Sequence, residues 1–394
     1  MGVIETSRGR GDTGDWTDRA CPIHNVAVTD LSTAAALRTL DLLPDPVLLV
    51  RFSEAEGPQI VYGNEAAGEH FRLAIPGVAV GAALRQPVLL ESVENALETG
   101  APAEVAFESI GVQPRYWRAF IRPLGPAELV LVLRDETDAR RTERMRADFL
   151  ANASHELRTP LASLAGFVET LRTHAKDDAP AREKFLGIMA EQTGRMTRLI
   201  NDLLSLSRIE LNEHIAPSGA VDLVQVLQDV ADGIRPLLAE RGISIAIAAD
   251  GPAVVVGDRD QLVQVVQNLV DNAVKYSPTG ASVGVAFQRA ENLEAARAPS
   301  RSGGVTLSLL TPDAADQAYQ VIRVADVGRG IARQHLPRLS ERFYRVEGQS
   351  GGGTGLGLAI VKHVINRHRG GLIVESEEGA GATFTAFLPA ATVT

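Results

Sequence analysis

A histidine with a carboxylate beside it stands in the segment 149–160, which reads FLANASHELRTP. His155 is followed directly by Glu156. A neutral imidazole attacks best when a neighbouring carboxylate accepts its other ring N–H, because this contact fixes the tautomer and raises the basicity of the free nitrogen. The segment therefore predicts a nucleophilic histidine with Glu156 as its partner. A lone His-Glu pair is more often solvated surface, so the surrounding chain has to support this role.

A second group of polar residues follows the pattern of a helix in 267–277, QNLVDNAVKYS. Asn268 and Asn272 are four residues apart and share a helix face, with Lys275 and Tyr276 nearby. Mg²⁺ prefers hard oxygen ligands, so an amide carbonyl together with triphosphate oxygens is a suitable set. Alone, such an asparagine pair is more often structural, because side-chain amides routinely cap and bridge helices.

Two glycine-rich segments come later in the chain. The segment 326–330, DVGRG, follows a predicted strand at 320–325, and the segment 351–358, GGGTGLGL, opens a predicted helix. Glycines let backbone N–H groups approach a phosphate, and a helix N-terminus adds a favourable dipole. A tight turn is the plain alternative for each. The nicotinamide-binding pattern is missing, because the second segment follows no strand.

The elements that position His155 are two predicted helices, each with an apolar seam. The seam residues are Leu157, Leu161, Leu164, Val168 and Leu171 in the first helix, and Phe185, Met189, Met196, Leu199, Leu203 and Leu206 in the second. Joined through 174–180, the helices form a hairpin whose core is too small to be stable alone, so we predict a homodimer with a four-helix bundle. His155 lies about 200° around the helix from Leu157 and is expected to point away from that core.

Thr159 follows one turn beyond His155 on the same face. Pro160 removes the backbone hydrogen bond to the carbonyl of Glu156, which loosens the helix beside the nucleophile. A threonine inside a helix often donates to the carbonyl four residues earlier, here that of His155, and this contact is the structural alternative to a chemical role for Thr159.

The composition limits the classes of protein that fit. The chain has 394 residues and a net charge of −10, which predicts two or three domains and no nucleic-acid partner. Cys21 is the single cysteine, so no intrachain disulfide or thiolate metal cluster is possible. No segment has the length and apolarity of a membrane span or the order of a signal peptide. We therefore expect a cytoplasmic protein, with recruitment by a membrane partner left open.

Changes of pattern along the chain predict its domains. Residues 1–34 form a flexible tail, and 35–135 alternate short strands and helices in a small α+β domain. Residues 136–214 hold a charged connecting helix and the hairpin, and 221–394 form an α/β domain. An insertion at 288–319, rich in alanine, serine and glycine, is expected to be a floppy surface loop.

The motifs occur in one order that resembles the bacterial sensor histidine kinases over about 150–390. These motifs are HELRTP at 155–160, NLVDNAVKYS at 268–277, DVGRG at 326–330, RFYR at 342–345 and GGTGLGLAIVK at 352–362. The resemblance implies a multidomain protein with a dimerisation and phosphotransfer hairpin and an α/β sandwich ATP-binding domain of the Hsp90-like (GHKL) type. Residues 35–135 resemble a PAS sensor module, and segments 189–214 and 336–347 are similar to phosphate-regulon sensor kinases.

The resemblance also implies roles for single residues. Asn272 is expected to hold Mg²⁺, while Asn268 and Lys275 address the phosphates of ATP. Tyr276 is expected beside the nucleotide, and Asp326 is expected to accept the adenine amino group, with Gly328 and Gly330 as the pocket wall. Phe343 is expected to anchor a lid at 331–353, and Arg345 to contact a phosphate. The remaining expected nucleotide contacts are Gly353, Thr354, Gly355, Leu356, Gly357 and Thr383.

The predicted function follows from these parts. The resemblance implies that ATP·Mg²⁺ is the donor for phosphorylation of His155, and that the phosphohistidine then donates its phosphoryl group to an aspartate on the receiver domain of a separate response regulator. Thr159 resembles the residue that orients water for dephosphorylating that partner, so a phosphatase activity is expected as well. An ATPase of the Hsp90 and MutL type, and a signalling adaptor without kinase activity, are the alternatives.

Overall fold

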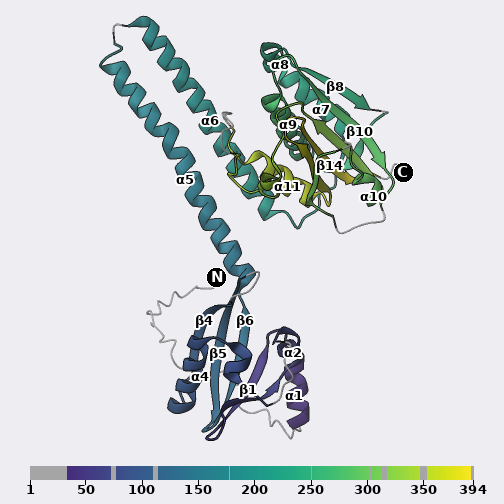
Figure 1. Cartoon of the computed structure of the whole chain (residues 1–394). Helices are drawn as coiled ribbons and strands as arrows, with labels where there is room; N and C mark the ends of the chain where they lie inside the picture. The colour runs from purple at the N-terminus through teal and green to yellow at the C-terminus, as the bar shows by residue number, and fades with distance from the viewer. Residues whose placement is uncertain are drawn as a thin grey trace, which may run out of the picture. The chain divides into compact units, whose positions relative to one another are not determined.

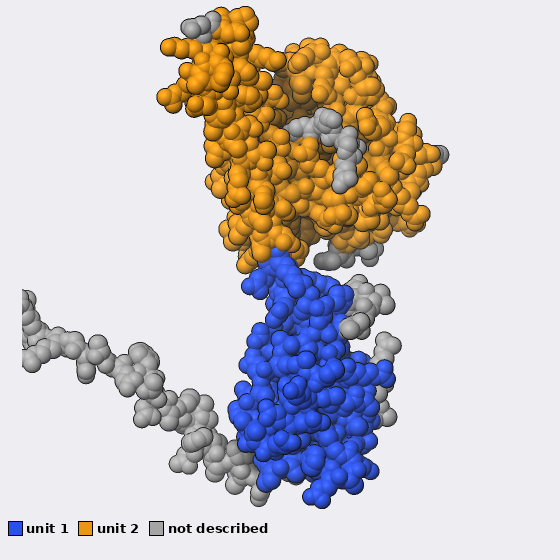
Figure 2. Space-filling model, turned by 60° about the vertical axis from the view of Figure 1, so that its left-hand side comes forward, with its two compact units in different colours: residues 1–144 blue, residues 145–394 orange. Residues whose placement is uncertain are grey.

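The computed structural model describes residues 33–71, 77–109, 114–176, 178–249, 251–300, 303–312, 317–346 and 353–391. The chain divides into two compact units, residues 1–144 and 145–394 (Figure 2). Residues 1–32, which make up most of the predicted tail, lie outside the described residues, and the first helix begins at Thr33. In the described part of the chain, no helix is long and apolar enough to cross a membrane.

The first unit is an α+β domain, as predicted. Its elements are α1 (Thr33–Asp41), β1 (Val47–Ser53), β2 (Gly57–Gly63), α2 (Glu65–Phe71), β3 (Val78–Ala79), α3 (Val80–Leu84), α4 (Pro87–Thr99), β4 (Ala103–Ser109), β5 (Arg115–Gly125) and β6 (Glu128–Asp135). The strands form one antiparallel sheet in the order β3-β2-β1-β6-β5-β4. Alternating residues of β6, namely Leu129, Leu131 and Leu133, are fully buried in the core that α4 covers.

The helical hairpin consists of α5 (Thr137–Arg172) and α6 (Ala179–Leu211) (Figure 1). The charged connecting segment and the histidine segment are continuous in α5, as expected from the absence of breakers before Pro160. The side chain of Asp178 caps α6 by accepting a hydrogen bond from the N–H of Ala181 at 2.9 Å. The rings of Phe167 and Phe185 meet across the hairpin at 5.4 Å between centroids.

The C-terminal domain is an α/β sandwich. Its elements are β7 (Ala220–Asp222), α7 (Leu223–Gly233), α8 (Arg235–Arg241), β8 (Ser244–Ala249), β9 (Val254–Val256), α9 (Arg259–Tyr276), β10 (Ser282–Ala290), α10 (Leu293–Ala296), β11 (Val305–Leu310), β12 (Tyr319–Ala325), a 3₁₀ helix η1 (Arg333–Arg338), α11 (Gly357–Arg367), β13 (Gly371–Glu377) and β14 (Gly381–Pro389). Six strands form a sheet in the order β11-β13-β14-β12-β10-β8, in which only β8 and β10 are parallel.

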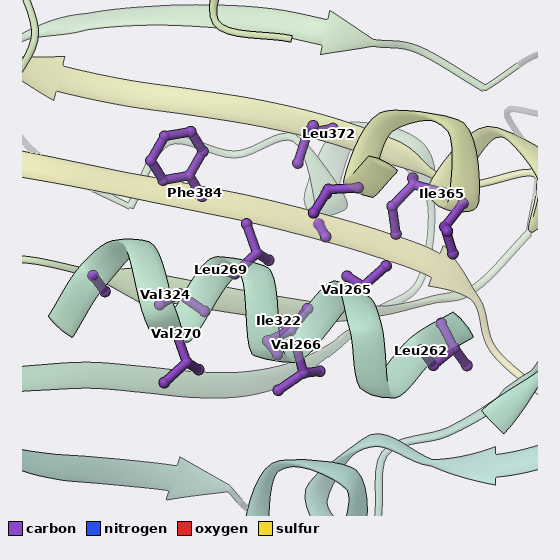
Figure 3. Packing of buried hydrophobic residues seen from close by; sticks show 14 of the residues in the cluster. Leu262, Val265, Val266, Leu269, Val270, Ile322, Val324, Ile365, Leu372 and Phe384 are labelled. Atoms are coloured by element: carbon purple, nitrogen blue, oxygen red, sulfur yellow. The ribbon is translucent and has the colours of Figure 1, made fainter. Parts of the chain in front are cut away.

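The apolar face of α9 fixes which residues of that helix remain available for a site. Leu262, Val265 and Leu269 are buried in one core cluster that also contains Val324 and Phe384 of the sheet (Figure 3). Burial of apolar surface gives this packing its stability, at roughly 1.5–3 kcal/mol for each large side chain. Because the buried residues occupy one side of the helix, its polar residues project from the other side.

The insertion predicted as a floppy loop is largely ordered, so that prediction was wrong for its described residues. β10 continues to Ala290, α10 follows, and β11 occupies 305–310. The reason lies in strand alternation, which places Tyr319, Val321 and Phe387 on the sheet face opposite α9. Leu293 and Ala296 of α10 cover these side chains and form a second, smaller core.

We expect His368 to make the unfolding free energy depend on pH. Its ring is 3% exposed; Nε2 accepts the N–H of Asp258 at 3.0 Å, and Nδ1 bonds the Val364 carbonyl at 2.7 Å. Burial lowers the pKa of this imidazole. Below about pH 6.5 the unfolded chain therefore binds the extra proton, and stability falls as the pH falls, by up to about 1.4 kcal/mol per unit.

Denaturant unfolding at about pH 7 and about pH 5 measures this dependence. His368→Gln keeps an acceptor for the Asp258 N–H but cannot titrate, so its loss of stability over the interval should be smaller. Equal losses in the two proteins would show that another group is responsible.

Candidate functional site

A cavity of about 720 Å³ lies in the second unit, between α9, the glycine-rich segments and α6. Eleven of the predicted nucleotide contacts line it: Asn268, Asn272, Lys275, Tyr276, Asp326, Gly330, Arg345, Gly353, Thr354, Gly355 and Gly357. Residues from four separate parts of the sequence therefore converge on one cavity of the size expected for a small-molecule ligand.

The polar face of α9 forms one wall. The side-chain nitrogen Nδ2 of Asn268 is buried and has no hydrogen-bond partner among the described residues. A buried donor of this kind suits a phosphate oxygen, because leaving it unpaired is costly. A Cβ added at Gly353 would lie 2.8 Å from Nζ of Lys275, which places that ammonium beside the glycine-rich segment. Asn272 follows one turn after Asn268 and offers an amide oxygen, the ligand type that Mg²⁺ accepts.

Asp326 lies at the end of β12 and is 7% exposed. Its Oδ1 accepts hydrogen bonds from the N–H groups of Gly328 at 2.8 Å and Ala382 at 3.2 Å. These two donors fix the carboxylate in one orientation at the cavity wall. Gly328 therefore orients Asp326 from behind and is not itself among the described residues that line the cavity.

We expect Gly330→Ala to destabilise the site. Gly330 has φ +68°, and a Cβ there would lie 1.9 Å from the carbonyl oxygen of Glu377, so the backbone has to move. Gly379→Ala is a matched control, because Gly379 has φ +85° but nothing within 4 Å of its added Cβ. Conformational strain alone should cost about 1 kcal/mol in Gly379→Ala, and the clash should add several kcal/mol in Gly330→Ala. Denaturant unfolding measures the stability of both variants, and equal losses of unfolding free energy would contradict the predicted clash at Gly330.

The predicted lid is described from 331 to 346 and at 353, and the residues 347–352 lie outside the described part. Phe343 has φ +63° and donates its N–H to the carbonyl of Gly355 at 2.9 Å. Its ring lies 5.9 Å from that of Phe149 on α5. Phe343 is partly buried against the main core and is not among the described residues that line the cavity, and its role as an anchor stays a prediction.

Two other predicted contacts lie behind the cavity. Leu356 is fully buried in the main core, and Thr383 is 2% exposed within β14. Neither belongs to the described cavity lining, so the structure gives both a packing position where the sequence analysis expected nucleotide contact. Leu356 is apolar and lies at the N-terminus of α11, where it packs into the core. Thr383 lies in β14, which is hydrogen-bonded on its two sides to β12 and β13.

His155 is exposed on α5, in agreement with the helical-wheel prediction. Glu156 has a different partner from the expected one, because its Oε2 accepts a hydrogen bond from Arg195 of α6 at 3.0 Å. The hydroxyl of Thr159 donates to the carbonyl of His155 at 3.3 Å, the structural alternative considered from the sequence. His155 is not among the described residues lining the cavity.

The sequence analysis missed the contribution of α6 to this cavity. Arg198 and Asp202 of α6 line it opposite Asp271 of α9, and Asp202 accepts a hydrogen bond from the hydroxyl of Thr354 at 2.8 Å. Burial raises the pKa of Asp202 and of Asp271, while the charge of Arg198 lowers the pKa of both. The heptad pattern indicates that these residues lie off the hairpin seam, but it contains no signal for what they face.

Further contacts hold α6 and the residues that directly follow it against the C-terminal domain. Arg342 pairs with Glu210, and His363 lies 3.4 Å from Glu213. Arg367 donates to the carbonyl of Ile215 at 3.0 Å. The hairpin and the C-terminal α/β domain therefore share one compact unit, with the cavity wall formed by both.

The fold combines a helical hairpin that carries an exposed histidine with an α/β domain whose cavity suits a nucleotide. Two protein-family models match these same two parts of the chain. Residues 145–212 match the His Kinase A (phospho-acceptor) domain, and residues 257–392 match the histidine kinase-, DNA gyrase B- and HSP90-like ATPase family. The chain belongs to the sensor histidine kinases.

The similar proteins carry matching names. The phosphate regulon sensor protein PhoR of Pseudomonas aeruginosa is 37% identical over 68% of this chain and 55% of its own length. The sensor-like histidine kinase SenX3 of Mycolicibacterium smegmatis is 32% identical over 76% of this chain and 74% of its own. The sensor histidine kinase WalK of Bacillus subtilis is 32% identical over 66% of this chain and 39% of its own. The chain thus spans little more than half of PhoR and less than half of WalK.

Proposed function

We propose that this protein is an ATP-dependent kinase that phosphorylates itself on His155 and passes the phosphoryl group to an aspartate of a response regulator. The observation that carries the proposal is the convergence of Asn268, Lys275 and Asp326 on one cavity in the same compact unit as an exposed histidine. An Hsp90-type ATPase would use the same cavity but would leave the exposed imidazole without a role.

In the proposed reaction a ring nitrogen of His155 attacks the γ-phosphorus, the bond from that phosphorus to the bridging oxygen breaks, and ADP leaves. Such transfer depends on positioning and on charge neutralisation more than on covalent help from the protein. Lys275 and Arg345 supply positive charge at the cavity. Glu156 orients the imidazole once Arg195 releases it, and the segment 216–219 is the hinge that brings His155 to the cavity.

Mg²⁺ fits the residues that are present. Asn272 lines the cavity with a side chain able to offer a hard oxygen, and bound Mg²⁺ would neutralise charge on the triphosphate. The remaining ligands would be phosphate oxygens and water, since this ion usually keeps several waters.

We propose a homodimer built through the hairpin. Several seam and neighbouring apolar residues are exposed in the single chain, with Leu161 at 57%, Val168 at 44% and Leu204 at 52%. A partner hairpin would bury them in a four-helix bundle.

Thr159 would position water for dephosphorylating the regulator when its hydroxyl releases the carbonyl of His155.

The N-terminal unit is proposed as a PAS-type sensor domain, on the basis of its antiparallel sheet flanked by short helices. Phosphate-starvation signalling is the proposed pathway, because a relative from Pseudomonas aeruginosa that is 37% identical is named phosphate regulon sensor protein PhoR. A cytoplasmic location, with recruitment by a membrane partner as an alternative, completes the proposal.

Incubating the purified protein with γ-labelled ATP tests the function. A kinase gives covalent label that is lost in acid and retained in alkali, as a phosphohistidine requires. Release of phosphate without labelling would instead support the ATPase, and absence of nucleotide binding would support the adaptor. Either result would contradict the kinase.

A further inference from the structure

Helix α6 carries three polar residues that line the ATP-site cavity, namely Glu191, Arg198 and Asp202. Asp202 makes a direct hydrogen bond to Thr354, the single hydroxyl in the glycine-rich segment at the cavity. The same hydroxyl oxygen accepts the N–H of Leu356 at 3.3 Å, just before α11 begins. The hairpin therefore holds the segment that is predicted to surround the nucleotide.

The charges at this contact are arranged around one arginine. Asp202 on α6 and Asp271 on α9 are both part-buried carboxylates, and Arg198 is the cation that favours the charged form of each. Within the described residues, Arg198 makes no salt bridge of its own. Arg198 thus stabilises the negative charge of Asp202 and Asp271 from the cavity wall, without forming a salt bridge to either carboxylate.

Resting on the proposed function, we propose that Arg198 and Asp202 make α6 a sensor of the terminal phosphate of ATP. When the triphosphate is bound, Arg198 pairs with its terminal phosphate, and Asp202 gives up its hydrogen bond to Thr354. The glycine-rich segment is thereby released from the hairpin at Thr354, and the cavity is freed to approach His155.

The physical reason is competition for the same charge and the same hydroxyl. A phosphate is a stronger partner for arginine than a distant carboxylate, because it accepts charge-assisted hydrogen bonds from the planar guanidinium. Once Arg198 turns to the phosphate, Asp202 loses its compensating charge and faces a like charge in a cavity of low dielectric. The hydroxyl proton of Thr354 can be donated to only one acceptor at a time.

Linkage then predicts opposite effects for the two residues. If bound ATP weakens the Asp202–Thr354 contact, weakening that contact must strengthen ATP binding by the same factor. Removing Arg198 must weaken binding instead. ADP, which lacks the terminal phosphate, should respond much less to either change.

Titration of the full-length protein with ATP, as its non-hydrolysable β,γ-imido analogue, and with ADP measures these effects. We expect Arg198→Ala to weaken binding of the analogue about tenfold. Asp202→Asn should strengthen it about fivefold, because a neutral amide oxygen is a weaker acceptor for the Thr354 hydroxyl than a carboxylate. The affinity for ADP should change by less than about twofold in both variants. Arg208→Ala, on the same helix, and Asp229→Asn, which loses the exposed ion pair to Arg259, are matched controls for the change of charge.

The outcomes separate this inference from the proposed function. If the unaltered protein binds the analogue and is labelled by ATP, but both variants bind like the controls, the sensor is overturned and the kinase stands. Weaker analogue binding in Asp202→Asn, or equal losses for ADP and the analogue in Arg198→Ala, would also overturn it. Failure of the unaltered protein to bind either nucleotide would overturn the proposed function and this inference together.

Discussion

Replacing His155 with alanine is expected to abolish covalent labelling by γ-labelled ATP while leaving nucleotide binding unchanged. The imidazole is the proposed acceptor of the phosphoryl group, and no other residue of the hairpin can replace its ring nitrogen at that position. His155 is exposed and its side chain makes no packing contribution to the core, so the substitution should not disturb the fold. The loss should exceed about a thousandfold, the usual consequence of removing a covalent nucleophile.

His174→Ala serves as the control for this experiment. His174 lies in the turn between α5 and α6, is exposed, and contacts the hydroxyl of its neighbour Thr173 at 2.8 Å. His174→Ala also replaces a histidine of the hairpin, but far from the HELRTP segment, so labelling should persist in this variant. Retention of acid-labile label in His155→Ala, or its loss in His174→Ala, would move the phosphorylation site away from His155.

Asp326→Asn should remove high-affinity adenine nucleotide binding without unfolding the domain. The amide oxygen of asparagine can still accept the N–H groups of Gly328 and Ala382, which now bind Oδ1. The substituted side chain would then present an NH₂ donor toward the cavity, where the proposed adenine amino group is also a donor. Two opposed donors in a buried site should weaken ATP binding about a hundredfold.

The matched comparisons are Asp326→Ala and Asp232→Asn. Alanine leaves two buried N–H groups without an acceptor, so the unfolding free energy should fall by about 1–3 kcal/mol for each, in addition to the loss of binding. Asp232 forms an exposed pair with Arg235, and Asp232→Asn should leave both properties unchanged. Calorimetric titration and denaturant unfolding measure the two effects separately. Unaltered ATP affinity in Asp326→Asn would exclude Asp326 from adenine recognition.

The pattern of the sequence was sufficient for the main elements. Strand alternation at 129–133 and the heptad seams of the hairpin are local signals, because the spacing of apolar residues directly reflects the geometry of a strand or helix. Helix geometry also predicts that His155 points outward. In α9, the positions of the apolar residues predict which side of the helix carries the polar residues. Eleven of the nucleotide contacts predicted from the motifs line the cavity, although the roles of individual residues remain predictions.

Only the tertiary structure decided the rest. The pairing of Glu156 with Arg195, the burial of Leu356 and Thr383, and the ordered insertion at α10 all depend on surfaces that are distant in sequence. The contact of Asp202 with Thr354 joins residues 152 positions apart. Spacing within one helix specifies which residues share a face, but it does not specify which surface covers that face. That choice is made by packing and charge between domains, because these energies exist only once the chain has folded.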